Sequence, residues 1–443
     1  MANTLKLGIA GLGTVGVGVW KLLNENRDRI FANAGCALEI TAVCARDASI
    51  DRGIDLSTVR WFDDADAMAK ADDVDIFVEL IGGEEGIAKT SVEAALASGK
   101  HVVTANKALL AHHGNELAAL AESHDVALNY EAAIAGAIPI VKSLREGLAG
   151  NDVASVVGIL NGTCNYILTK MASEGREFAD VLAEAQEMGY AEADPTFDVG
   201  GHDTAHKLAI LTCLAFGTKI DFDAVYLEGI EAITQADLIA AQDLGYCIKL
   251  LGVAVRTDTG IEQRVHPSLV PISSPIAAID GAFNAVAVDG NYAGKIILQG
   301  AGAGQKPTAS AVIADIIDIA RVNALFPLGR EVAKLAPYKR ARMRAHEGGY
   351  YIGLSVYDHP GAVAAIAKRF AEQDISLESI IQRGVSVHPG GKEGGNKDTV
   401  GQQPVVLITH ETAEAALREA LASIEADGHI ADHPRMIRIE KTI

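Results

Sequence analysis

A short acidic stretch ahead of an apolar run is the part of the sequence best equipped for chemistry. Residues 190–207, YAEADPTFDVGGHDTAHK, hold four carboxylates, two histidines and one lysine, and the chain continues directly into LAILTCLAFG. Charged groups at the start of a buried helix are costly unless they are paired or used in function. The stretch is therefore a candidate metal site, a set of helix-capping acids, or an acid/base centre.

Two of these interpretations rest on the histidines and acids alone. His202 and His206 stand four residues apart, on one face of a helix, and HDTAH is similar to the zinc-binding pattern HExxH. Asp203 replaces the glutamate of that pattern, and no third ligand is evident. Alternatively, Asp198 or Asp203 would cap the helix and interact with its dipole, which is the commonest task of acids at that position.

The acid/base interpretation rests on a second pair with the same spacing. Asp203 and Lys207 share a helix face, with the acid toward the N-terminus, which is the favourable order. A lysine has an ordinary pKa of about 10.4, which must fall toward neutrality before the amine can move a proton efficiently. Burial and a second cation would lower it, and Lys107 is a candidate for that cation. Glu192 and Asp203 would then be free to hold an ammonium group of a substrate.

The N-terminal segment carries a dinucleotide-binding pattern. LKLGIAGLGTVG is a predicted strand followed by Gly11-x-Gly13-x-x-Gly16, and a helical pattern and a second strand, LEITAVCAR, come next. In that context the glycines are typical of a Rossmann fold: Gly11 for the tight turn, Gly13 for approach to the pyrophosphate, and Gly16 for helix–strand packing. The phosphates would lie at the helix N-terminus.

Two strand ends refine this prediction. The second strand ends in Ala45-Arg46-Asp47, where an arginine accommodates the 2′-phosphate of NADP and an acid binds the ribose of NAD. Arg46 comes first and favours NADP, while Asp47 keeps NAD open. A later strand ends in Thr104-Ala105-Asn106-Lys107, which would face the nicotinamide, although Lys107 could also be a solvated lysine at a helix start. Together with the acid/base pair, this favours a nicotinamide oxidoreductase acting on an amino acid.

Composition excludes several classes of protein. A chain of 443 residues with 49% hydrophobic and 22% charged residues predicts a soluble protein of two or three domains. The net charge of −20 argues against nucleic-acid binding. Five scattered cysteines without a CxxC pair, no export signal and no apolar run of membrane-spanning length favour a reducing cytoplasm without a membrane anchor.

The rest of the chain predicts two further units. Alternating strands and helices up to about residue 135 predict a mostly parallel sheet, and GILNGTCNYILTKM then predicts a strand that leads into a helix. From residue 349 the order is βαββαβ, with a first helix beginning at Pro360-Gly361 and a loop, HPGGKEGGNK, between two strands. The polar stretch ARMRAHEG before this unit is a predicted linker.

Six ordered motifs resemble those of the homoserine dehydrogenase family over essentially the whole chain. They are GLGTVG (11–16), VTANKALL (103–110), YEAAIAGAIPI (130–140), GILNGTCNYILT (158–169), GYAEADPTFDVGGHDTAHKLAIL (189–211) and GAGAGQKPTASAVIADI (300–316). The resemblance implies NAD(P)-dependent interconversion of L-homoserine and L-aspartate 4-semialdehyde in the biosynthesis of threonine, methionine and isoleucine. It also implies an α/β architecture: a Rossmann domain (1–135, with about 305–340 returning to it), an α+β substrate and oligomerisation domain (136–304), and a C-terminal ferredoxin-like ACT domain (349–443).

The resemblance also assigns individual residues. Catalytic roles fall on Lys207, Lys107 and Asp198, and substrate binding falls on Glu192 and Asp203. The implied cofactor contacts are Gly11, Leu12, Gly13, Thr14, Val15, Gly16, Arg46, Thr104, Lys107, Gly189 and Gly302. A sodium ion would be held by backbone oxygens in a loop that contains Glu131, Ile134, Gly136 and Ile138. The family further implies a cytoplasmic homo-oligomer, a dimer or a tetramer, in which threonine acts on the ACT domain.

Two rival functions remain open at this point. An acylating semialdehyde dehydrogenase would need an activated cysteine, and Cys164 in NGTCNY is the candidate. A non-catalytic amino-acid sensor would use the nucleotide-binding and C-terminal units only, and it would bind ligands without turnover. The C-terminal unit could likewise serve dimerisation alone.

Overall fold

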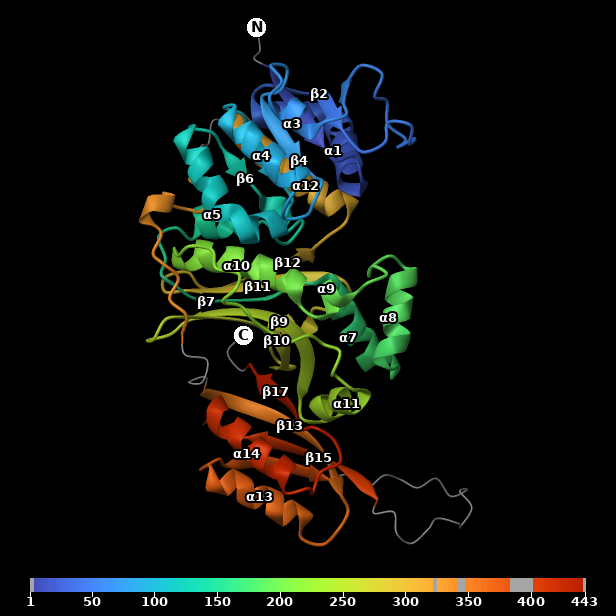
Figure 1. The fold of residues 1–443 in the computed structure, drawn as a ribbon, viewed down its shortest axis with the longest axis vertical. Coiled ribbons are helices and arrows are strands. Elements are labelled where there is room, and N and C mark those ends of the chain that lie inside the picture. The colour runs from blue at the N-terminus through green and yellow to red at the C-terminus, as the bar shows by residue number, and fades with distance from the viewer. Residues whose placement is uncertain (1–3, 322–324, 342–346, 383–400, 441–443) are drawn as a thin grey trace.

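The protein is arranged as three parts that follow one another along its longest axis (Figure 1). The computed structural model describes residues 4–321, 325–341, 347–382 and 401–440. The loop HPGGKEGGNK (388–397) and most of the predicted linker (342–346) lie outside these ranges. No described helix is both long and apolar enough to cross a bilayer.

The first part is built on a parallel sheet, as the alternation of strands and helices predicts. Its six strands run in the order β3-β2-β1-β4-β5-β6, and every pairing between them is parallel. Such a sheet is covered on both faces, and its central strand β4 is accordingly buried along its whole length. The strands are β1 (Thr4–Ala10), β2 (Ala37–Cys44), β3 (Arg60–Phe62), β4 (Ile76–Glu79), β5 (His101–Thr104) and β6 (Leu128–Asn129).

Helices cover the two faces of this sheet in separate apolar clusters. One cluster joins the sheet to α3 (Ala65–Ala69), α4 (Ile87–Ala97) and α5 (Lys107–Ser123). The other joins it to α1 (Thr14–Glu25), α2 (Arg27–Ala34) and α12 (Gln305–Ala320). Helix α12 follows α1 by almost three hundred residues in the chain, yet the two pack side by side, because Gly18 leaves room for Gln305 and Ala309. This return of the late helix matches the family resemblance.

The middle part is a mainly antiparallel sheet with helices on one side, in which only the short strand β8 pairs in parallel, with β10. Its strands are β7 (Val153–Ile159), β8 (Tyr226–Leu227), β9 (Tyr246–Arg256), β10 (Ile261–Pro271), β11 (Phe283–Gly290) and β12 (Gly294–Ala301). Its helices are α7 (Gly162–Glu174), α8 (Phe178–Glu187), α9 (Thr196–Val199), α10 (His202–Phe216) and α11 (Gln235–Asp243). The short elements η1 (Glu131–Ala133), α6 (Ile140–Lys142) and η2 (Ser143–Gly147) connect it to the first part.

Helix α10 occupies the centre of the molecule. It contacts α5 of the first part and the strands β7, β9 and β10 of the middle part. All of its residues from Asp203 to Phe216 are buried, and a helix that is enclosed on every side belongs to a core. The charged groups of its first turn therefore lie at the boundary between the two parts.

The C-terminal part continues the middle sheet. Its elements are β13 (Glu347–Tyr357), α13 (Ala362–Glu372), β14 (Leu377–Gln382), β15 (Gln402–Thr409), β16 (Thr412–Ala413), α14 (Glu414–Ala426) and β17 (Arg435–Ile439). They follow the predicted βαββαβ order, and the strands lie in the order β17-β13-β15-β14. Strand β17 also pairs in parallel with β10, so that the middle and C-terminal parts share one 11-stranded sheet. The sequence pattern predicts the module but not this junction.

Candidate active site

The glycine turn between β1 and α1 is shaped by close backbone contacts. Gly11 has a left-handed φ of 105°, and a Cβ atom there would lie 2.3 Å from the carbonyl oxygen of Leu80. A Cβ atom on Gly16 would lie 2.1 Å from the carbonyl oxygen of Gly11. Gly13 has open space around it, as approach by a ligand requires. The motif predicts that Gly16 allows close packing of the helix. Gly18 also allows close packing, because it faces α12.

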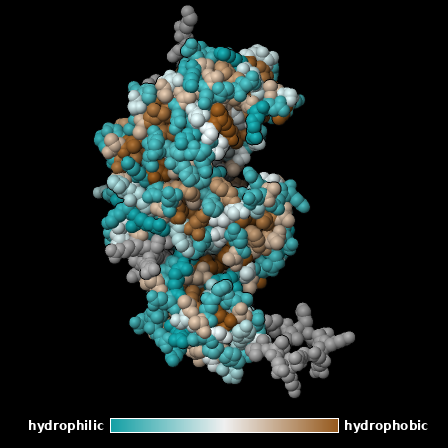
Figure 2. Space-filling view, in the orientation of Figure 1, coloured by the Kyte–Doolittle hydropathy of each residue, from teal (hydrophilic) through white to brown (hydrophobic). Residues whose placement is uncertain are grey.

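A cavity of about 640 Å³ opens beside this turn and is large enough for a nucleotide. Gly11, Leu12, Gly13 and Arg46 line it, together with Asp47. Figure 2 shows the surface hollowed between the uppermost part of the molecule and the middle part below it. These four predicted cofactor residues are therefore gathered at one cavity.

The arginine and acid at the end of β2 face this cavity differently. The Asp47 carboxylate accepts hydrogen bonds from the backbone amide (2.8 Å) and hydroxyl (2.6 Å) of Ser49, whereas Arg46 is exposed. A second arginine, Arg52, also lines the cavity, donates from Nε to the Leu12 carbonyl, and lies over the ring of Trp61. Arg52 is a candidate residue that the sequence pattern did not reveal, because it lies in an irregular loop outside any motif.

The other predicted cofactor residues lie elsewhere around the site. Thr14 is exposed at the start of α1, and Val15 packs against the apolar cluster under the sheet. Thr104 is fully buried, and its hydroxyl donates to Glu79, so the structure does not expose it to a ligand. Gly189 follows α8 in open space with φ of 74°. A Cβ atom on Gly302 would collide with the side chain of Asn284.

Asp203 joins two lysines at the start of α10. Its Oδ1 atom lies 2.7 Å from Nζ of Lys107, and its Oδ2 atom lies 2.8 Å from Nζ of Lys207. Lys107 is the first residue of α5 at the end of β5, so the two lysines come from different parts of the molecule. The contact places the predicted second cation next to the predicted acid/base lysine.

Charge and burial set the proton affinities of these groups. Burial and the charge of Lys107 hold the pKa of Lys207 below its ordinary value, although Asp203 acts in the opposite direction. Asp203 raises the pKa of Lys107. Burial alone would raise the pKa of the Asp203 carboxyl, but the two lysines outweigh it and hold that pKa well below its usual range. Lys207 is thus the lysine prepared to lose a proton.

An asparagine and a backbone carbonyl orient these charged groups. The Nδ2 atom of Asn161 donates to both Asp198 (2.8 Å) and Asp203 (2.9 Å), and its Oδ1 atom caps α7 by accepting from the amide of Cys164. The carbonyl of Leu160 accepts from Nζ of Lys207 at 2.7 Å. The strand-to-helix turn at residues 160–162 therefore fixes the site. The sequence predicts a strand that leads into a helix here, but nothing in it indicates contacts with residues forty positions later.

Two predicted carboxylates flank the lysines. Asp198 is half-buried, and burial followed by the charge of Asp203 raises its pKa. Glu192 is exposed on the segment between α8 and α9, and its charge helps to raise the pKa of Lys107, so it faces the same site. Neither Asp198 nor Asp203 caps a helix, because Gly201 stands at the N-cap of α10 and Pro195 at that of α9. The capping part of that interpretation is therefore wrong, whereas both acids do lie in the first turn of a helix, where a carboxylate interacts favourably with the dipole.

The histidines belong to an aromatic cluster. The ring of His206 lies 4.5 Å from that of Phe222 and 5.3 Å from that of His112, and His202 stacks on Phe197. Burial and then His112 lower the pKa of His206 to about 4, so its ring is neutral. Within the described ranges, no group of three or more His, Cys, Asp or Glu side chains is arranged to hold a metal ion. The aromatic neighbours explain the HDTAH spacing without zinc.

Cys164 does not have the surroundings of a nucleophile. It is fully buried, and its Sγ atom lies 3.2 Å from the carbonyl oxygen of Asp198, to which it donates. Burial, followed by the charges of Asp198 and Asp203, raises the pKa of its thiol well above the ordinary value. A reactive cysteine needs the opposite, a thiolate favoured by nearby positive charge. The structure gives no support to the acylating alternative.

Comparisons with known proteins identify the family of the chain. The family model "Homoserine dehydrogenase, NAD binding domain" matches residues 11–131, and the model "Homoserine dehydrogenase" matches residues 139–317. The homoserine dehydrogenase of Neisseria gonorrhoeae is 44% identical over 98% of each chain. A crystal structure of a homoserine dehydrogenase from Thiobacillus denitrificans has a TM-score of 0.91 and 41% identity over 99% of each chain. A hyperthermophilic archaeal homoserine dehydrogenase solved with NADPH is 27% identical, with a TM-score of 0.63, over 73% of this chain and all of that one.

Proposed function

The chain belongs to the homoserine dehydrogenase family of NAD(P)-dependent oxidoreductases, and from this premise we propose that Lys107, Asp203 and Lys207 form its catalytic centre. The proposal rests on the buried carboxylate of Asp203, which lies between two lysines. The pKa of Lys107 is raised and that of Lys207 is lowered. The reaction is the interconversion of L-homoserine and L-aspartate 4-semialdehyde, in the biosynthesis of threonine, methionine and isoleucine. Assays of NADP(H)-linked turnover of L-homoserine and L-aspartate 4-semialdehyde test this activity. Binding of these compounds without turnover would favour the non-catalytic amino-acid sensor.

Lys207 moves the proton in this mechanism. The glycine turn and Arg46 would hold the nicotinamide cofactor, which when bound would supply the hydride acceptor for C4 of homoserine. At the same time the neutral amine of Lys207 takes the proton of the C4 hydroxyl, and in the reverse direction its ammonium returns that proton to the carbonyl oxygen. Asp203 and the Leu160 carbonyl hold the Nζ atom in place.

The carboxylates bind and orient the substrate. Glu192 and Asp203 attract its ammonium group, and Asp198 lies near the reacting hydroxyl. Asp203 also hydrogen-bonds both lysines and Asn161, so its contribution to substrate binding includes the positioning of these neighbours. Lys107 is partly exposed, so its ammonium group would be accessible to both the substrate and the nicotinamide. Holding these groups in one geometry supplies much of the rate acceleration.

The cofactor site prefers NADP. The guanidinium of Arg46 is exposed at the nucleotide cavity, where it can bind a 2′-phosphate, while Asp47 is held by Ser49. We expect Arg46→Ala to raise the KM for NADP at least about tenfold while leaving that for NAD nearly unchanged. Steady-state kinetics with both cofactors measures this, with Arg60→Ala, an exposed arginine on β3 outside the cavity, as the control. An unchanged ratio of the two KM values would remove Arg46 from this role.

The loop between η1 and α6 fits a sodium ion held by backbone oxygens. Residues 134–138 are an irregular segment that is almost wholly buried, and Gly136 has a left-handed φ of 55°. Hard cations accept carbonyl oxygens as ligands. The carbonyls of Glu131 and Ile138 each accept one backbone hydrogen bond, from the amides of Ile134 and Ile140, and a carbonyl oxygen has a second lone pair. The backbone oxygens of Glu131, Ile134, Gly136 and Ile138 would hold the ion. Sodium titration followed by the melting temperature decides whether the loop binds it.

The C-terminal part is an ACT regulatory domain that responds to threonine. Its βαββαβ order and its place in the sheet of the middle part support this role. We expect threonine to lower the rate of homoserine oxidation by the full-length chain, because an effector that prefers one conformation shifts the population toward it. The full chain is required, since removal of residues after 345 would expose the edge of β10 that pairs with β17. If the rate is independent of threonine, the domain serves dimerisation only.

A further inference from the structure

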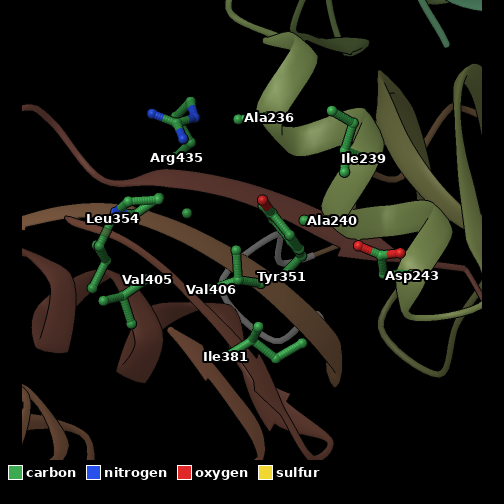
Figure 3. A pocket seen from close by; sticks show the side chains of 12 residues that line it. Ala236, Ile239, Ala240, Asp243, Tyr351, Leu354, Ile381, Val405, Val406 and Arg435 are labelled. Carbon is green, nitrogen blue, oxygen red and sulfur yellow. The ribbon is translucent and has the colours of Figure 1, made fainter. Parts of the chain in front are cut away.

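A cavity lies between the middle and C-terminal parts, away from the lysine pair. It measures about 190 Å³ and is bounded by α11 on one side and by strands β13, β14, β15 and β17 on the other (Figure 3). The sheet offers this face because its other face is covered: Tyr350 and Ile352 pack with α13 and α14, while Tyr351 points to the cluster that contains α11. The cavity is thus a gap at the junction of two parts.

The walls of the cavity are mainly aliphatic. Ile239 and Ala240 line it from α11, and Ile381 and Val406 line it from the sheet. Ile239 is 47% exposed, so a large apolar side chain on this wall is incompletely covered by the protein. An aliphatic group of a ligand would remove that surface from water.

The guanidinium of Arg435 lines this apolar cavity and keeps N–H donors that have no acceptor in the described part of the chain. Arg435 donates from Nε to both oxygens of Asp237, at 3.2 and 2.9 Å. Asp237 is fully buried and also accepts from the hydroxyl of Tyr351 at 2.8 Å and from Thr234. A guanidinium has five N–H donors, and across the described part of the chain the two terminal nitrogens of Arg435 have no hydrogen-bond acceptor.

A glycine makes room for this arrangement. A Cβ atom on Gly353 would lie 2.9 Å from a terminal nitrogen of Arg435 and 3.0 Å from Asp237. With glycine at that position, Asp237 fixes the guanidinium through Nε while its terminal nitrogens stay at the cavity wall, where the side chain is 29% exposed. A fixed guanidinium with two open nitrogens is a receptor for a carboxylate.

We propose that this cavity binds a small aliphatic carboxylate, with its carboxylate on Arg435 and its hydrocarbon chain against Ile239, Ala240 and Val406. Asp243 lines the same cavity, and in the view of Figure 3 it stands at the opposite end from Arg435. A branched-chain α-amino acid would bring an ammonium group in addition to the carboxylate, whereas a 2-oxo acid would use the carboxylate contact only. The inference does not depend on the proposed function, because binding is measured without turnover.

Calorimetric titration of the full-length protein tests the proposal with L-leucine, its 2-oxo acid and L-leucinamide. We expect L-leucine to bind and L-leucinamide, which lacks the carboxylate, to bind at least about tenfold more weakly. Binding of the 2-oxo acid as strong as that of leucine would assign the site to carboxylates in general, and weaker binding would assign it to amino acids. Absence of binding by both carboxylates at millimolar concentration would overturn the proposal.

Two variants locate the ligand. Arg435→Lys keeps a cation beside Asp237 but removes the planar pair of donors, and Ala240→Leu fills the cavity from a half-buried position. Each should weaken binding at least about tenfold. The matched controls are Arg369→Lys, which alters an arginine–aspartate pair on α13, and the exposed Ala364→Leu on the same helix. Binding that survives both cavity variants would place the ligand elsewhere, for example at the substrate site, and would overturn the proposal.

Discussion

Replacing Lys207 by alanine should lower kcat for homoserine oxidation by at least about a hundredfold, the lower end of the range for general acid–base catalysis. The variant removes the amine that accepts the hydroxyl proton, while Lys107 stays beside Asp203 but is held protonated by that carboxylate. Cofactor binding should be nearly unchanged, because Lys207 does not line the nucleotide cavity. Steady-state turnover and fluorescence titration with NADPH measure the two quantities.

The pH dependence gives a second measure of the same group. Burial lowers the pKa of Lys207, so the rate of homoserine oxidation should rise with pH and level off below the ordinary pKa of a lysine. Reduction of the semialdehyde needs the protonated amine and should fall as pH rises through the same value. Both limbs should vanish in Lys207→Ala. Lys170→Ala, which removes a half-buried lysine of α7 that pairs with Glu174 outside the site, is the control, and a near-normal kcat in Lys207→Ala would exclude the role.

Replacing Asp203 by asparagine should affect both stability and turnover. The change removes the negative charge that two lysines share in a buried position, and breaking a buried pair in this way costs about 3 kcal/mol in the free energy of unfolding. kcat should fall as well, because Lys207 loses one of the two acceptors that orient its Nζ atom. Urea denaturation and steady-state kinetics measure the two effects, with Asp180→Asn on the exposed side of α8 as the control.

The sign of the pH effect separates this role from simple loss of packing. Asp203 raises the pKa of Lys207, so its removal lowers that pKa further, and the rising limb of homoserine oxidation should move to lower pH. In the variant, the folded state binds fewer protons than the unfolded state, because unfolding restores an ordinary lysine. Stability relative to the wild type should therefore recover as the pH rises from the Lys207 pKa of the variant to the higher Lys207 pKa of the wild type. A deficit in stability that is independent of pH would indicate a packing defect only.

Local patterns in the sequence were sufficient for most elements of the fold. The glycine turn at residues 11–16, the strands around it and the βαββαβ order of the C-terminal part follow from hydrophobic periodicity and turn residues, which act over a few positions. The pairing of β17 with β10 was not predictable in this way, because strand pairing between distant segments leaves no local signal. The return of α12 to the first sheet was expected from the family resemblance alone.

The candidate site also has one part that follows from a local pattern and another part that depends on contacts between distant segments. Asp203 and Lys207 share one helix turn, so the sequence by itself determined that an acid and a lysine lie side by side, and four-residue spacing was enough to infer it. Only the tertiary structure decided which further groups meet them. Lys107 arrives from a strand end almost a hundred residues earlier, and Asn161 and the Leu160 carbonyl arrive from a turn in the middle part. Their convergence depends on the packing of α10 between two sheets, and that burial, which no spacing expresses, also lowers the pKa of Lys207.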